Sequence, residues 1–164
     1  MKRYTTDIKI GLIVGKFAPL HRGHQFLIET AIKKMDQVII LVYRCPKNIK
    51  ISLKRRAKWI KYLYPSIKVI TGRNAPTEKG NDPSITQKNI NYVKHAVRFP
   101  ITHVFSSEKY GQLLSQALGA KNILVDEKRK HFPISATQIR NNPETYKKFL
   151  EPMIYKEIKK SIQK

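Results

Sequence analysis

Apolar residues along the chain follow two patterns that alternate with each other. Short runs rich in β-branched residues, typical of buried parallel strands, occur at residues 10–14, 37–43, 68–71, 101–106 and 122–126. Apolar residues at three- and four-residue spacing, typical of helices with one buried face, occur at residues 26–35, 53–64, 85–97 and 110–118. This alternation predicts an α/β fold with a doubly wound, five-stranded parallel sheet.

The last part of the chain has a helical pattern only. Tyr146, Phe149 and Leu150 predict a short packed helix, and residues 151–164 predict a basic amphipathic helix that packs onto the domain. The length of 164 residues corresponds to one domain, residues 1–164, with a core over about residues 8–150.

The loop after the first strand carries the densest cluster of candidate chemistry. Residues 15–24 read Gly-Lys-Phe-Ala-Pro-Leu-His-Arg-Gly-His. A loop that leads from a strand into a helix favours phosphate, because it offers free backbone N–H groups and the positive end of the helix dipole. Lys16, His21 and His24 add cationic or hydrogen-bonding groups, and Gly23 lets a ligand approach the backbone. The competing interpretation is that both histidines only cap or pack at the helix start.

A second motif follows the fifth predicted strand. Residues 134–140 read Ile-Ser-Ala-Thr-Gln-Ile-Arg, in which Ser135 is a candidate N-cap and Thr137 lies in the first helical turn. Helical side chains lean toward the N-terminus, so the Arg140 guanidinium can approach a ligand bound there. The competing interpretation is an ordinary capped helix.

Together the two motifs resemble the nucleotidyltransferase superfamily of adenylyl- and cytidylyltransferases. Within it, the chain most resembles the nicotinamide mononucleotide adenylyltransferases, especially the adenylyltransferase domain of the bifunctional bacterial NAD-biosynthesis regulators. The resemblance spans roughly residues 8–150. It includes Lys58-Trp59, residues 104–108, Val125-Asp126 with Arg129, and Asn142-Pro143.

This resemblance implies a Rossmann-like fold and a reaction. AMP would pass from ATP to nicotinamide mononucleotide by direct in-line attack, giving NAD and pyrophosphate. The resemblance implies Mg²⁺ carried by the ATP phosphates, without metal ligands from the chain. An aromatic partner for the nicotinamide ring is not evident, and Trp59, Tyr43 and Tyr92 are the candidates.

The resemblance also implies which residues form the site. Ser106 and Ser107 follow the carboxyl end of a strand, where open α/β sheets bind ligands. Arg129 either reaches phosphate or pairs with Asp126. The expected catalytic residues are His21, His24, Lys16 and Arg140, and the expected nucleotide-binding residues are Gly15, Phe17, Gly23, Ser106, Ser107, Arg129, Ile134, Ser135 and Thr137.

The charge of the chain leaves a second class of function open. A net charge of +22, from 33 Lys and Arg against 11 Asp and Glu, attracts nucleic acid nonspecifically. We favour solvated lysines over a nucleic-acid partner, but a basic nucleic-acid-binding module with an inactive nucleotidyltransferase fold stays an alternative. Among enzymes, the alternatives are another phosphorylated acceptor, such as phosphopantetheine, or CTP as donor.

Location and assembly are constrained more weakly. No apolar run approaches the roughly 20 residues of a membrane span, and residues 1–7 lack the apolar core of a secretory signal. We therefore expect a cytoplasmic protein without a membrane partner. The single cysteine, Cys45, excludes an internal disulfide framework. Relatives form homo-oligomers, but the sequence identifies no interface.

Overall fold

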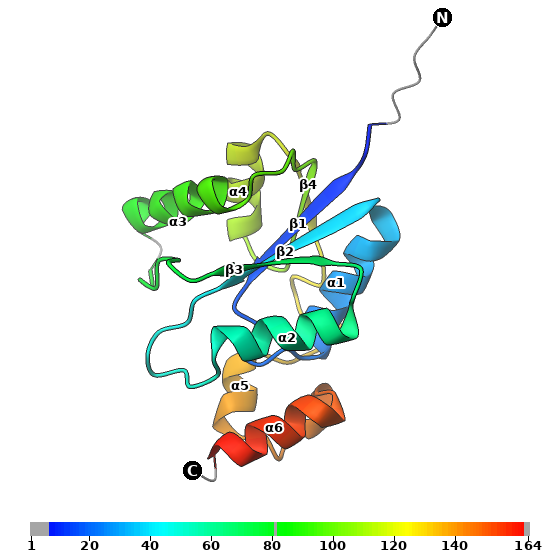
Figure 1. The fold of residues 1–164 in the computed structure, drawn as a ribbon, viewed down its shortest axis with the longest axis vertical. Helices are drawn as coiled ribbons and strands as arrows, with labels where there is room; N and C mark the ends of the chain where they lie inside the picture. Colours follow the sequence, from blue (N-terminus) through cyan, green and yellow to red (C-terminus); the bar gives the residue numbers. More distant parts are fainter. Residues whose placement is uncertain (1–6, 81, 163–164) are drawn as a thin grey trace, which may run out of the picture.

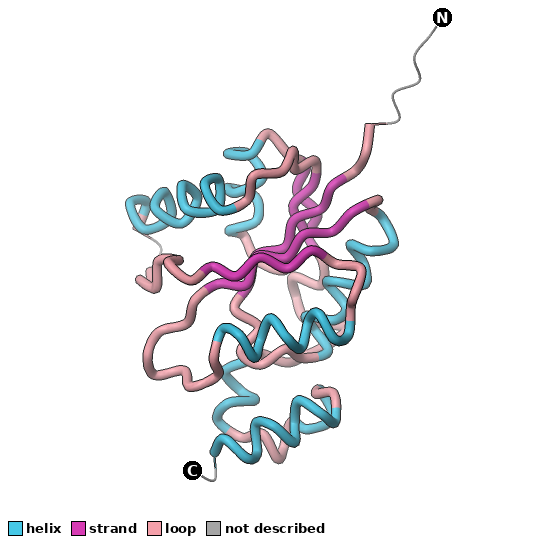
Figure 2. Tube along the Cα trace, viewed as in Figure 1, coloured by secondary structure: helices cyan, strands magenta, loops and turns pink. Residues whose placement is uncertain are grey.

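The computed structural model describes residues 7–80 and 82–162, and a five-stranded parallel sheet lies at its centre (Figures 1 and 2). Residues 163 and 164 of the predicted basic tail lie outside this described part. The strand order is β3-β2-β1-β4-β5, which confirms the doubly wound parallel sheet. The strands are β1 (Ile10–Gly15), β2 (Gln37–Tyr43), β3 (Lys68–Gly72), β4 (His103–Ser106) and β5 (Lys121–Leu124).

Helices cover both faces of this sheet because the inner strands are apolar on both faces. In Figure 1, α3 and α4 lie on one side of the sheet, and α1, α2, α5 and α6 lie on the other. Ile13 and Ile40 pack toward α1 and α2, whereas Leu12 and Ile39 pack toward α3 and α4. The described helices are α1 (Arg22–Lys34), α2 (Leu53–Leu63), α3 (Pro83–Ala96), α4 (Tyr110–Leu118), α5 (Ala136–Asn141), α6 (Pro152–Ile162) and the 3-10 helix η1 (Lys147–Phe149).

Two strands are shorter than the apolar runs that predicted them. β4 starts at His103, directly after Thr102. The Thr102 hydroxyl accepts from the Ile10 N–H at 2.9 Å, and the hydroxyl and the backbone N–H of Thr102 both donate to the Ile10 carbonyl, at 3.1 and 3.0 Å. β5 ends at Leu124, two residues before Asp126, where the backbone turns with a φ of 51°. Apolar composition reports burial, and Ile101 and Val125 are buried although they lie outside the two strands.

The C-terminal helix α6 packs onto the domain, as predicted. Glu157 on α6 accepts a hydrogen bond from Trp59 Nε1 on α2 at 3.1 Å. Just before α6, Glu151 accepts from Gln25 Nε2 at 2.9 Å and pairs with Arg22, both on α1. None of the helices in residues 7–80 and 82–162 combines the length and apolar character needed to cross a membrane.

Candidate active site

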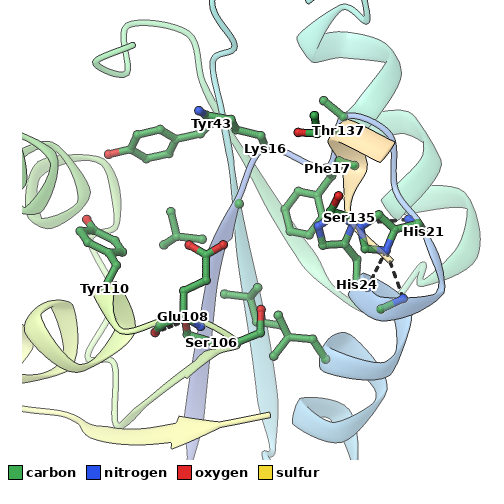
Figure 3. Close-up of a pocket in the computed structure, with 18 of the residues that line it drawn as sticks. Lys16, Phe17, His21, His24, Tyr43, Ser106, Glu108, Tyr110, Ser135 and Thr137 are labelled. Atoms are coloured by element: carbon green, nitrogen blue, oxygen red, sulfur yellow. Dashed lines mark hydrogen bonds between the residues drawn. The ribbon is translucent and has the colours of Figure 1, made fainter. Parts of the chain in front are cut away.

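A cleft of about 560 Å³ opens at the carboxyl edge of the sheet (Figure 3). Its walls come from the segments that follow β1, β2, β4 and β5, together with part of the connection between β3 and α3. The structure brings all of the sequence-predicted site residues to this cleft, although their roles stay predictions. They are Gly15, Lys16, Phe17, His21, Gly23, His24, Ser106, Ser107, Arg129, Ile134, Ser135, Thr137 and Arg140.

The two histidines of the first motif are held at the start of α1. His21 is the N-cap, and its Nδ1 accepts hydrogen bonds from the N–H groups of Gly23 at 3.1 Å and His24 at 3.4 Å. His24 Nδ1 accepts in turn from the His21 N–H at 3.4 Å, and the two rings stack at 3.8 Å. An imidazole that accepts at Nδ1 carries its proton on Nε2 when neutral. Capping therefore leaves each histidine with an Nε2–H donor, which no other described residue uses.

Burial makes these histidines neutral. It lowers the pKa of His21 to about 4, and the positive charge of Arg129 contributes. It also holds the pKa of His24 well below its usual range, with further contributions from His21 and Arg129. Of the two roles expected from the sequence, this burial favours hydrogen-bond donation over positive charge. The cationic groups beside them are Lys16, Arg129 and Arg140.

Glycine and phenylalanine set the shape of the first loop. A Cβ on Gly23 would lie 3.0 Å from the Cε1 of the capping His21 ring, so a side chain there would press on that ring. Phe17 is 1% exposed and packs edge-on against His24 with ring centroids 4.9 Å apart. Gly23 thus leaves room for the His21 ring that caps α1, and the Phe17 ring packs against the ring of His24.

The second motif is joined to the first by Arg140. Its Nη1 donates to the Ala18 carbonyl at 2.6 Å, and its Nη2 donates to Thr137 Oγ1 at 3.2 Å. Ser135 is the N-cap of α5, as predicted, since its Oγ accepts from the Gln138 N–H at 3.2 Å. One guanidinium therefore fixes the distance between the β1–α1 loop and the start of α5.

The turn after β4 uses one of its predicted ligand-binding groups for itself. Ser106 Oγ accepts from the Glu108 N–H and donates to the Glu108 carbonyl, both at 2.9 Å. Gly111 permits this turn, because a Cβ there would lie 2.4 Å from the Ser106 Cβ. The Ser106 hydroxyl therefore shapes the turn, while Ser107 lines the cleft without such a bond among the described residues.

The structure separates the two interpretations of Arg129. The Asp126 carboxylate accepts from the N–H groups of Lys130, His131 and Phe132 at 2.7, 3.1 and 3.1 Å, and it pairs with the His131 ring at 3.2 Å. Arg129 has no ion-pair partner in the described part of the chain and is exposed at the cleft. Its guanidinium is therefore available to a ligand.

Among the candidate aromatic partners, the structure favours Tyr43. Trp59 is fully buried between α2 and α6, and Tyr92 packs against Tyr43 at 5.6 Å without lining the cleft. Tyr43 does line it, and its hydroxyl donates to the Asn89 carbonyl at 3.2 Å. Tyr110, which the helical pattern marked only for packing, lies beside it (Figure 3). The Tyr110 hydroxyl is buried without a partner among the described residues, and burial raises its pKa to about 12.

Arg56 holds backbone segments near the cleft in place, and the sequence analysis did not identify it as a site residue. It is 1% exposed, and its guanidinium donates to the carbonyls of Ile51 at 3.0 Å, Tyr43 at 2.7 Å and Lys16. No carboxylate pairs with it among the described residues. The helix 53–64 pattern marks Arg56 as one of several basic residues, and nothing local distinguishes it from its exposed neighbours.

The cleft contains no protein site for a metal ion within the described residues. Groups of three or more His, Cys, Asp or Glu side chains at metal-binding spacing are absent there. Glu78 pairs with Lys88 at 2.7 Å, and the Asp126 carboxylate is used by the backbone.

The strand order, and a cleft at which the two sequence motifs meet, are those expected of an α/β nucleotidyltransferase. The family described as cytidylyltransferase-like matches residues 12–142, and the chain belongs to this family. Its fold is also that of a bifunctional NMN adenylyltransferase/ADP ribose pyrophosphatase from Francisella tularensis. That likeness has a TM-score of 0.70 at 16% identity, covering 96% of this chain and 50% of the other.

Two curated relatives have names that point to different substrates, one to NAD biosynthesis and one to phosphopantetheine. The trifunctional NAD biosynthesis/regulator protein NadR of Salmonella typhimurium is 28% identical over 159 residues, which cover 86% of this chain and 38% of NadR. A phosphopantetheine adenylyltransferase of Fusobacterium nucleatum is 39% identical over 66 residues, covering 38% of this chain and 40% of the relative. The chain thus spans well under half of the length of the NadR relative.

Proposed function

We propose that the protein transfers AMP from ATP to nicotinamide mononucleotide, forming NAD and releasing pyrophosphate. The observation that carries the proposal is the Arg140 bridge, which holds both phosphate-binding motifs on one cleft beside the Tyr43 ring. The likeness to NadR over 86% of the chain supports the acceptor, since that relative's name places it in NAD biosynthesis.

In this proposal, one end of the cleft would bind the phosphates of ATP and the other would bind the acceptor. The phosphate end consists of Lys16, His21, His24, Ser135, Thr137 and Arg140, and the acceptor end consists of Tyr43, Glu108 and Tyr110. At the acceptor end, the Tyr43 ring would lie against the nicotinamide, since aromatic rings favour offset stacking or edge contacts. Gly15, Phe17, Ser106, Ser107, Arg129 and Ile134 would complete the nucleotide site.

The chemical step would need positioning more than proton transfer. An oxygen of the acceptor's phosphate attacks the α-phosphorus of ATP in line, and the bond from that phosphorus to the oxygen bridging the β-phosphate breaks. The attacking phosphate is already ionised, so catalysis rests on orientation and on neutralisation of the developing charge. Lys16 and the histidine Nε2–H groups would hold the α- and β-phosphates, and Ser135, Thr137 and Arg140 the β- and γ-phosphates. Mg²⁺ bound to ATP would supply further charge neutralisation.

The test is pyrophosphate release from ATP and magnesium with a panel of acceptors. We expect release with nicotinamide mononucleotide, and NAD among the products. The panel includes phosphopantetheine, because the Fusobacterium relative is named for that acceptor, and CTP in place of ATP. If pyrophosphate is released only with phosphopantetheine or only with CTP, the assignment of the phosphate-binding residues stands, but the proposed acceptor or donor is wrong. If no acceptor or nucleotide in the panel gives pyrophosphate release, and the protein binds RNA at physiological salt, the nucleic-acid-binding alternative is favoured.

A further inference from the structure

Acidic side chains are scarce in this chain, yet they occur in the cleft. The sequence has 11 Asp and Glu against 33 Lys and Arg, and Glu78, Glu108 and Asp126 all line the cleft. Glu78 pairs with Lys88, and Asp126 is held by three backbone N–H groups. The Glu108 carboxylate is exposed and has no hydrogen-bond or ion-pair partner among the described residues. It is the cleft acid that no structural role accounts for.

Local structure directs the Glu108 side chain into the cleft. Its backbone is fixed on both sides by the Ser106 hydroxyl at the end of β4. In Figure 3 the Glu108 side chain projects into the cleft between the Tyr43 and Tyr110 rings on one side and the histidines on the other. The carboxylate therefore faces the space where the two ends of the cleft meet.

A negative charge at this position works against the binding of two phosphate-bearing substrates, since like charges repel across a cleft. The repulsion is offset when one substrate carries a positive charge on the same side. The pyridinium ring of nicotinamide mononucleotide has such a charge, whereas phosphopantetheine has none. The tyrosines beside Glu108 also suit a flat ring, because cations and aromatic edges both interact favourably with aromatic faces.

We propose that Glu108 is a specificity residue, which favours an acceptor with a cationic aromatic ring and an uncharged ring substituent. This inference rests on the proposed function and deepens it. Glu108 attracts the pyridinium charge and repels a carboxylate on the ring, so it selects the amide over the acid form of the acceptor. Because the carboxylate is exposed, solvent screens the interaction, and we expect about a tenfold effect on selectivity.

Three acceptors of nearly equal size test this proposal. They are nicotinamide mononucleotide, its reduced form with a neutral dihydropyridine ring, and nicotinic acid mononucleotide with a ring carboxylate. Wild-type protein should prefer the first of these in kcat/KM. Glu108→Gln should reduce its preference over the reduced form about tenfold and raise kcat/KM for the nicotinic acid form, with an unchanged KM for ATP. The matched control is Glu127→Gln, which removes an exposed acid outside the cleft and should leave all three ratios unchanged.

The outcomes separate this inference from the proposed function. If wild-type protein uses nicotinamide mononucleotide but Glu108→Gln shifts no acceptor ratio, the specificity role is wrong and the proposed function stands. If Glu108→Gln instead raises the KM for ATP, the carboxylate binds the nucleotide, which also overturns the inference. If wild-type protein forms no NAD, both proposals fall.

Discussion

Apart from Lys16, the side chains of the phosphate end are held by hydrogen bonds within the protein, whereas the acceptor end presents polar groups that the described residues leave unpaired. His21 and His24 accept backbone N–H groups, and Arg140 donates to the Ala18 carbonyl. At the acceptor end, the Tyr110 hydroxyl and the Glu108 carboxylate have no partner among the described residues. Only Tyr43 there has its polar group satisfied, by the Asn89 carbonyl.

This difference follows from what each end must do in the proposed reaction. Groups that stabilise developing charge are most effective when the protein fixes them beforehand, because no reorganisation is then needed during the reaction. Groups that select a substrate gain from being unpaired until the ligand arrives, since a wrong ligand leaves them unsatisfied. Side chains that the protein fixes by hydrogen bonds therefore suit a role in catalysis, and side chains with unpaired polar groups suit a role in substrate selection.

The largest expected effect comes from removing single groups at the phosphate end. His24→Ala and Arg140→Ala should each lower kcat by roughly 10² to 10³, because each removes one preorganised charge-stabilising group. The loss should be similar for cationic and neutral acceptors, unlike the effect of Glu108→Gln. Initial rates of pyrophosphate release measure it, with the exposed Arg98→Ala as control. Near-normal turnover in both variants would contradict the assignment of the phosphate end.

The residues of the phosphate end could be proposed from the sequence because they lie in two short motifs, each close to a helix start. The capping bonds of His21 and Ser135 span three residues or fewer, and both motifs follow apolar runs that form strands. The doubly wound parallel sheet could be predicted because strands that alternate with helices have few allowed arrangements, although the order of the strands was not predicted. The sequence did not predict the protonation state of His21 and His24, because it depends on how deeply the whole fold buries them.

The acceptor end could be predicted only in part, because distant segments build it. Tyr43 ends β2, and Tyr110 starts α4, so no sequence spacing relates them. Arg56 reaches Lys16 across 40 positions of the chain, and Trp59 is covered by α6 through a bond across 98 positions. Contacts of this kind depend on how helices pack on the sheet, and the local pattern of apolar residues does not encode them.

Arg56 connects the two ends, so its removal should affect both. Arg56→Met leaves three backbone carbonyls without this donor, two of which form buried hydrogen bonds with it, and should lower the free energy of unfolding by about 3 kcal/mol. Because Lys16 and Tyr43 lose the same anchor, the KM values for ATP and for the acceptor should rise together. Urea unfolding and steady-state kinetics measure these effects.

The neighbouring residue provides the matched control for Arg56. Arg55 has a side chain that is 40% exposed, and it contacts Glu157 and Ser161 on α6. Arg55→Met should cost less than about 1 kcal/mol, as exposed ion pairs usually do. Equal stability of Arg56→Met and Arg55→Met would refute the anchoring role. If Arg56→Met does not fold, Arg56→Lys serves instead, with one donor group in place of the fork.

The smallest expected effect concerns pH and should separate the two ends again. The pKa of folded His21 is lowered to about 4 from an ordinary value of 6.5, so its neutral form is favoured by folding. This contribution to stability is fully present above pH 6.5 and is lost as the pH falls toward 4, because the unfolded state takes up the proton first. Between pH 7 and pH 5 it should amount to about 2 kcal/mol. At the acceptor end, burial raises the pKa of Tyr110 to about 12 and that of Tyr43 above its ordinary value, so both hydroxyls keep their protons throughout.

The variant that isolates this effect is His21→Asn. Asparagine is a good N-cap and can accept the same backbone N–H groups, but it does not titrate. Urea unfolding at pH 7 and pH 5 should therefore show a loss of stability in the wild type that exceeds the loss in His21→Asn by about 2 kcal/mol. His103, whose pKa is also lowered, is present in both proteins and cancels in this comparison. The pKa of His24 depends in part on His21, so the difference reports on His21 together with its coupling to His24. Parallel losses in the two proteins would mean that folding does not lower the pKa of His21, which would then take up a proton near pH 6.5 in the folded protein as well.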